Sequence, residues 1–171
     1  MANDQERADL LEALGTHRHF LRHTVRDLTD EQARQRTTAS ELTLGGLIKH
    51  VANTEKGWAD FVVDGPSALG DFSAMTESDF ARWTDQFKLL PGETLTGVLE
   101  DYAKIAQRTD ELVASLPDLN VSHPLPKAPW FPPGATRSAR RVFLHIIAET
   151  AQHAGHADII RESLDGAKSM G

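Results

Sequence analysis

The chain contains no cysteine in its 171 residues. This absence excludes disulfides, thiolate nucleophiles and cysteine-based zinc sites together. Any metal must therefore be held by histidine, aspartate or glutamate side chains. The lack of cysteine also favours a reducing compartment. Residues 1–7 are polar and acidic, without the apolar segment of a signal peptide, so we expect a cytoplasmic protein.

The chain also lacks long apolar runs and an excess of basic charge. No uninterrupted apolar segment approaches the roughly 18 residues needed to cross a bilayer, so no membrane partner is expected. The formal charge of −7 argues against nucleic-acid binding, because no basic stripe offsets it. The densest basic cluster, from Arg137 to Arg141, is interpreted as a solvated first turn of a helix.

What the chain does contain is helical periodicity. Apolar residues recur at spacings of three and four in four long segments, at 5–26, 43–63, 94–116 and from 137 or 138 to 164. Short helices are predicted at 29–33 and 77–86, and no segment alternates at period two for long enough to be a convincing strand. The length fits one domain over 1–171, and the pattern predicts an all-α four-helix bundle. A long proline-rich crossover, 118–136, precedes the last helix.

One face of the last predicted helix carries a carboxylate and two imidazoles. Glu149 and His153 are four residues apart and His156 follows three later, so all three lie within about 60° of arc. Such groups are costly to bury on an apolar face unless something binds them, and a divalent metal is the simplest candidate. A further ligand must come from another helix, and His50, among apolar neighbours, is the best choice. We therefore predict a metal site of His50, Glu149 and His153.

The residues around this site leave alternatives open. His156 could replace Glu149 as a ligand, or line the open side of the metal as a catalytic acid/base. Three protein ligands leave coordination positions for water or substrate, as in a catalytic site. His145 is assigned to the core or the pocket wall. No metal role is expected for the remaining histidines, His17, His19, His23 and His123. The wall of the pocket is expected from aromatic residues, namely Trp58, Trp83, Trp130 and Phe131.

Two segments resemble a known superfamily. Residues 47–58, LIKHVANTEKGW, resemble the second helix of DinB-like proteins. Residues 149–162, ETAQHAGHADIIRE, resemble the fourth helix of their actinobacterial mycothiol-transferase branch. The resemblance implies a four-helix bundle with a divalent metal held by three residues, most commonly one histidine on helix two and a His-x-x-x-His pair on helix four. Glu149 stands at the first position of that pair, as in the mycothiol-dependent isomerase relatives.

The resemblance also implies an activity. Members activate a low-molecular-weight thiol, mycothiol or bacillithiol, as a metal-bound thiolate, and transfer it to electrophiles or use it in isomerisation. We therefore expect a metal-dependent, mycothiol-type S-transferase acting on small electrophiles, and a homodimer, because bundles of this superfamily often self-associate. Zinc is the expected metal, with nickel, iron and manganese as alternatives for nitrogen and oxygen ligands. Two other functions stay open: a metal-dependent hydrolase or isomerase using metal-bound water, and a non-catalytic metal-binding stress protein.

Overall fold

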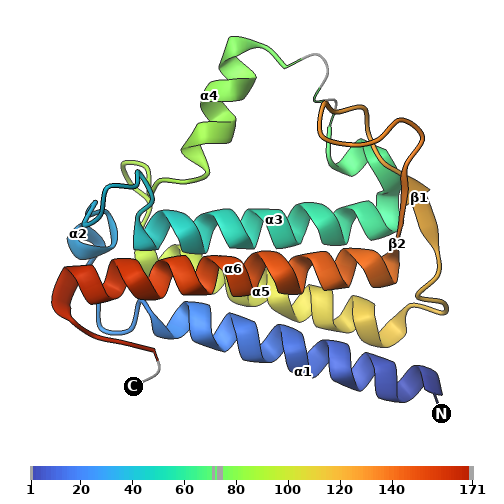
Figure 1. Cartoon of the computed structure of the whole chain (residues 1–171), viewed down its shortest axis with the longest axis horizontal. Coiled ribbons are helices and arrows are strands. Elements are labelled where there is room, and N and C mark those ends of the chain that lie inside the picture. The colour runs from blue at the N-terminus through green and yellow to red at the C-terminus, as the bar shows by residue number, and fades with distance from the viewer. Residues whose placement is uncertain (1, 71, 73–74, 170–171) are drawn as a thin grey trace.

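Four long helices form the body of the molecule. The computed structural model describes residues 2–70, 72 and 75–169. The long helices lie side by side in Figure 1 and are α1 (Ala2–His23), α3 (Leu44–Asp64), α5 (Leu95–Ser115) and α6 (Ala139–Asp165). The shorter elements are α2 (Asp30–Ala33), the 3-10 helix η1 (Gly65–Ala68), α4 (Glu77–Asp85), β1 (Ser122–Pro124) and β2 (Thr136–Ser138). The predicted all-α bundle is confirmed.

Side-chain caps set the starts of three long helices. The hydroxyls of Thr43, Thr94 and Ser138 accept hydrogen bonds from backbone N–H groups three residues further on. These N–H groups have no partner inside the helix, so the caps stabilise its first turn. At the other end of α6, Gly166 adopts φ 79° and its N–H donates to the Glu162 carbonyl at 2.9 Å. All these boundaries fall within a residue or two of the predicted ones.

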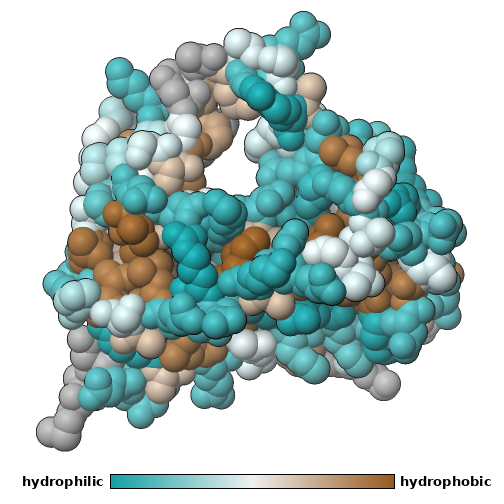
Figure 2. Space-filling model, turned by 180° about the vertical axis from the view of Figure 1, so that it is seen from behind, coloured by the Kyte–Doolittle hydropathy of each residue, from teal (hydrophilic) through white to brown (hydrophobic). Residues whose placement is uncertain are grey.

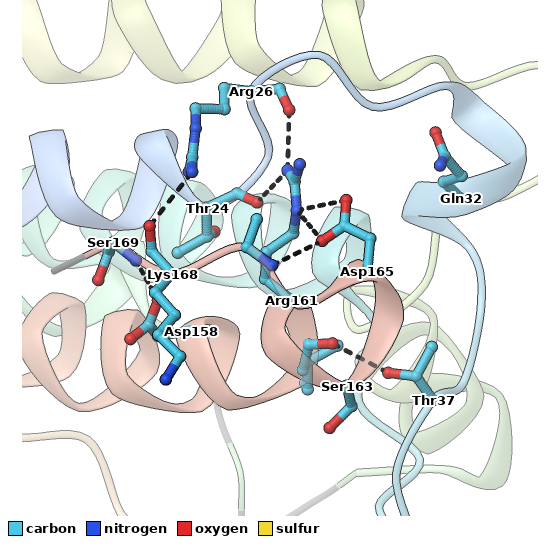
Figure 3. Close-up of polar contacts among 12 residues, drawn as sticks. Thr24, Arg26, Gln32, Thr37, Asp158, Arg161, Ser163, Asp165, Lys168 and Ser169 are labelled. Atoms are coloured by element: carbon cyan, nitrogen blue, oxygen red, sulfur yellow. Dashed lines mark hydrogen bonds and ion pairs between the residues drawn. The ribbon is translucent and has the colours of Figure 1, made fainter. Parts of the chain in front are cut away.

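The end of α1 differs from the prediction, which continued the helix to residue 26. The chain leaves the helix after His23 through tight turns and reaches a left-handed conformation at Asp27, with φ 60°. Arg161 of α6 donates to the carbonyl oxygens of Thr24 and Arg26, each at 2.8 Å, as Figure 3 shows. Carbonyl groups at the end of a helix have no partner inside it, and here a side chain from another helix satisfies two of them.

The proline-rich crossover folds back on itself as a small two-stranded sheet. β1 and β2 pair antiparallel, with His123 opposite Arg137, and Leu125 N–H donates to the Ala135 carbonyl at 2.8 Å beyond the last pair. The sequence predicts no strand here, because each strand has only three residues, which is too few to show an alternating pattern, and β1 contains a proline. The pairing places β2 directly before α6.

The core lies between α3 and its neighbours. α3 packs against α5 and α6, and α1 packs against α6. One apolar cluster surrounds the first half of α3, including Leu47 and Val51, and a second surrounds its last turns, including Phe61 and Val62. None of the described helices has the length and apolar character needed to span a bilayer.

A buried ion pair crosses this core. Arg18 of α1 donates to both carboxylate oxygens of Glu55 on α3, at 2.6 and 3.1 Å, and also to Asp110 of α5 at 2.8 Å. The Glu55 side chain is fully buried. Removal of one partner from such a pair leaves an uncompensated charge, which costs more than the pair itself contributes.

Glu55→Ala should lower the free energy of unfolding by about 3 kcal/mol, because Arg18 would keep only the partly exposed Asp110 as a partner. Urea unfolding at neutral pH measures the loss. Lys56→Ala is the matched control, since the Lys56 ammonium is exposed and pairs with Asp60 on the surface. Its expected cost is below about 0.5 kcal/mol, and equal losses in the two variants would contradict a structural role for the buried pair.

Candidate metal centre

Three side chains that are distant in the sequence meet where α3 packs against α6. His50 lies on α3, and Glu149 and His153 lie on α6. One nitrogen or oxygen atom from each lies within 4.8 Å of the others. His153 Nε2 is 3.6 Å from Glu149 Oε2, and the rings of His50 and His153 are 4.9 Å apart, nearly perpendicular. The structure therefore brings together the three residues that the sequence predicts as a ligand set.

The packing of the two helices fixes this arrangement. On α3, the buried side chains of Ile48 and Val51 flank His50 and set the rotation of the helix. On α6, Ile146, Thr150 and Ala154 are buried at intervals of four residues. The face beside this stripe, with Glu149 and His153, is therefore directed to the partly buried edge next to α3.

His50 has an unsatisfied nitrogen. Its Nδ1 is buried and has no hydrogen-bond partner among the described residues. Its ring stacks on Phe87, with centroids 4.2 Å apart. Burial, with a smaller contribution from His153, lowers the pKa of His50 to about 4, although Gln86 and Glu149 act in the opposite direction. The imidazole is therefore neutral at physiological pH, which is the form that binds metals.

Glu149 supplies the negative charge of the cluster. The His153 imidazole lowers the pKa of Glu149, and His145 adds to the effect, while partial burial opposes it. Glu149 is therefore a carboxylate at neutral pH. Two imidazoles and one carboxylate form a donor set that fits a divalent ion, and the orphaned nitrogen of His50 fits the same interpretation.

His156 stands behind His153, away from the cluster of three. The Nδ1 atoms of His156 and His153 are 3.3 Å apart, whereas Glu149 approaches the Nε2 atom of His153. Within the described chain, the group of atoms close enough to share an ion contains Glu149 and not His156. The acid/base role of His156 stays a prediction. The structure shows that His156 contacts Nδ1 of His153, the nitrogen on the far side from Glu149.

A cavity of about 810 Å³ opens over His50 and Glu149. All three tryptophans of the chain line it, together with Phe131, so the predicted aromatic wall is present. Trp83 comes from α4 and Trp130 from the crossover, the two parts that project on opposite sides of a gap above α3 in Figure 1. Figure 2 shows from behind that the molecule is open between these two projections.

His145 forms part of the same cavity wall. Its Nε2 is 3.8 Å from Glu149 Oε1, and its ring packs edge-on against Trp58, with centroids 5.0 Å apart. Burial lowers the pKa of His145, the nearby Arg137 lowers it further, and Glu149 opposes both. His123, for which no metal role is predicted, contacts the Val62 carbonyl at 3.1 Å and lies outside the cluster.

Arg137 is the site residue that the sequence interpretation misplaced. It is not on a solvated helical turn: it lies in β2, is half-buried, and lines the cavity. Its guanidinium carbon is 4.5 Å from the centre of the Trp58 ring and 5.4 Å from that of Phe131. The four-residue spacing of Arg141, His145 and Glu149 places these three on one face of α6, but it does not extend to Arg137, which precedes the helix.

These features define a helical bundle with a histidine–carboxylate cluster at the floor of an aromatic cavity. The family model described as Mycothiol-S-transferase matches residues 9–166, and the chain belongs to that family. The match includes His50, Glu149 and His153, and the resemblance to the mycothiol-transferase branch is confirmed. The family description names mycothiol as the thiol and S-transfer as the reaction. No curated protein matches the chain.

We expect the purified protein to bind one divalent metal per chain at this cluster. His50→Ala should reduce occupancy by about tenfold or more, because only two protein ligands would remain. Elemental analysis after dialysis against a weak chelator measures occupancy. His19→Ala, which changes an exposed histidine of α1, is the control.

The same measurement separates Glu149 from His156 as the third ligand. Glu149→Gln should release more of the metal than His156→Gln does, because the atoms of Glu149 lie within the cluster and His156 lies behind His153. The reverse pattern would assign the ligand role to His156. Full occupancy in His50→Ala would refute the site as a whole.

Proposed function

We propose that this protein is a metal-dependent S-transferase that joins a low-molecular-weight thiol of the mycothiol type to small electrophiles. The observation that carries the proposal is the cluster of His50, Glu149 and His153, whose atoms lie within 4.8 Å of one another at an open cavity. Membership of the Mycothiol-S-transferase family supports the choice of thiol. The absence of cysteine means that the nucleophilic sulfur must come from a cosubstrate.

His50, Glu149 and His153 are proposed to hold the metal, with zinc as the first choice. Two imidazoles and one carboxylate also suit nickel, iron or manganese. A divalent ion bound there would lower the pKa of a coordinated thiol, so that thiolate is available at neutral pH. Three protein ligands would leave coordination positions free for a thiol.

The other residues of the site are proposed to orient the ligands and the acceptor. With a metal on Nε2 of His153, Nδ1 of His153 would carry the proton and would donate a hydrogen bond to Nδ1 of His156, at the observed 3.3 Å. This bond fixes the tautomer and the plane of the His153 ring, so His156 acts as a positioning residue. The rings of Trp58, Trp83 and Trp130 provide an apolar wall that holds an electrophile and excludes water.

Conjugation of a bimane electrophile to mycothiol should require both the metal and His153. His153→Ala should lower kcat/KM by more than about 100-fold, because even residues behind a metal ligand cost 10- to 100-fold when removed. Chelation of the wild type should have the same effect. The catalysed rate should also remain high below a pH of about 8.5, where a free thiol is mostly protonated.

The controls distinguish this function from the two alternatives. His19→Ala should conjugate at the wild-type rate, because it lies outside the cavity. Equal rates in wild type, His153→Ala and chelated protein would show that S-transfer is wrong. Turnover of esters or of cis–trans isomers with metal but without thiol would then support a hydrolase or isomerase, and metal binding without turnover a stress protein.

A homodimer is also proposed, on the resemblance to self-associating bundles. Exposed apolar side chains suited to a contact are present on α6 at Leu144 and Ile159. Light scattering at micromolar concentration should give twice the 18.8 kDa mass of the chain. The mass of a single chain under those conditions would contradict the dimer.

A further inference from the structure

Arg137 occupies a fixed position at the wall of the cavity. It immediately precedes Ser138, the N-cap of α6, and its backbone is held in β2 opposite His123. The guanidinium lies over the faces of Trp58 and Phe131, whose rings are inclined at 71° to each other. Two inclined rings restrict how the guanidinium can turn, and its N–H donors lie in its own plane.

The positive charge of Arg137 is not matched by a protein carboxylate. No ion pair of Arg137 occurs among the described residues, whereas Arg18, Arg140 and Arg161 each have one. Nη1 of Arg137 is buried and has no hydrogen-bond partner within the described chain. Burial lowers the pKa of Arg137, as does Arg141, and only Glu149 acts in the opposite direction. A half-buried guanidinium with a free donor is costly unless a ligand supplies the acceptor.

The position of Arg137 relative to the cluster indicates how a ligand would lie. Arg141, His145 and Glu149 follow one another at four-residue intervals along α6, and all three line the cavity. Eight helical residues span about 12 Å along the axis. The backbone positions of Arg141 and Glu149 are therefore separated by about the length of a small molecule. Contacts connect the two ends: Arg137 lies over Trp58, Trp58 packs on His145, and His145 approaches Glu149.

We propose that Arg137 binds the carboxylate of a ligand whose reacting end lies at the cluster of His50, Glu149 and His153. The planar guanidinium matches a carboxylate through two parallel hydrogen bonds. The exposed Arg141 supplies a second positive charge at the mouth of the cavity. The identity of the reacting end rests on the proposed S-transfer, whereas binding of the carboxylate requires only Arg137 and the cavity. The carboxylate can belong to the electrophile or to the thiol.

Binding is tested first on the full-length protein as purified, without thiol. 4-Acetylbenzoate and acetophenone are an unreactive pair that differ only in the carboxylate. The fluorescence of Trp58, Trp83 and Trp130 reports binding, because all three line the cavity. We expect wild type to bind the acid about tenfold more tightly than acetophenone. Arg137→Gln should abolish this preference, and Arg137→Lys, which keeps the charge but not the planar fork, should retain part of it.

Arg36→Gln is the matched control for these variants. Arg36 is exposed, pairs with Glu41 at 3.5 Å on the surface and does not line the cavity. It should bind both compounds as the wild type does. Circular dichroism and thermal unfolding test whether each variant is folded. Loss of acetophenone binding would show that the cavity of a variant has collapsed. If Arg137→Gln collapses in this way, Arg137→Lys is used in its place.

Transfer then assigns the carboxylate to one cosubstrate. With phenacyl bromide or 4-(bromoacetyl)benzoate, the thiolate sulfur bonds to the methylene carbon, the carbon–bromine bond breaks, bromide leaves, and the thiol proton passes to solvent. If the electrophile carries the carboxylate, Arg137→Gln should lower kcat/KM about tenfold for the bromoacetyl acid and less than twofold for phenacyl bromide. If the thiol carries it, the loss should instead appear with 3-mercaptopropionate and not with 2-mercaptoethanol.

The outcomes separate this proposal from the proposed function. Equal binding of 4-acetylbenzoate by wild type and Arg137→Gln would overturn the assignment of Arg137. Selective binding that depends on Arg137, with no transfer from any thiol, would sustain the carboxylate site and remove S-transfer as the function. If transfer falls in His153→Ala but is unchanged in Arg137→Gln with every charged substrate, S-transfer stands and the carboxylate site at Arg137 is wrong.

Discussion

The packing of α3 against α6 is the contact on which the site depends. His50 and Glu149 are 99 positions apart in the sequence, and they meet only because the apolar faces of these helices set their rotation. A turn of either helix by one residue, about 100°, would carry its ligands away from the other. The buried pair of Arg18 and Glu55 further ties α3 to α1, so the position of His50 is fixed from two sides.

Two buried nitrogens without hydrogen-bond partners among the described residues indicate where the cavity binds its ligands. In the described chain, the buried side-chain nitrogens without a hydrogen-bond partner are Nδ1 of His50 and Nη1 of Arg137. Both residues line the same cavity. Native proteins satisfy nearly all buried polar groups, and exceptions mark places where an ion or ligand completes the bonding. One nitrogen belongs to a neutral imidazole and the other to a cation, so the two ends of the cavity differ in chemistry.

The sequence predicted the helices and the cluster because both depend on local spacing. The four-residue interval between Glu149 and His153 places them on one face whatever surrounds them. The choice between Glu149 and His156 depended on which side of α6 faces α3. The sequence does not reveal this side, because His153 has a possible ligand about one turn before it and another about one turn after it. Arg137 was out of reach for a related reason: the rings that hold it are Trp58, 79 positions earlier on α3, and Phe131 on the crossover. The strand that fixes its backbone was too short to leave a pattern.

The absence of cysteine acquires a chemical meaning at this site. An enzyme that brings electrophiles to a thiolate exposes its own nucleophiles to them, and a cysteine thiolate is the most reactive of these. The cavity is lined instead by aromatic rings, two guanidinium groups and two imidazoles, with no sulfur among the described lining residues. In the proposed reaction the only sulfur in the cavity is that of the cosubstrate, so the acceptor has a single soft nucleophile to meet. A metal held by His50, Glu149 and His153 would then make that sulfur reactive, and Arg137 would select the molecule that is bound beside the sulfur.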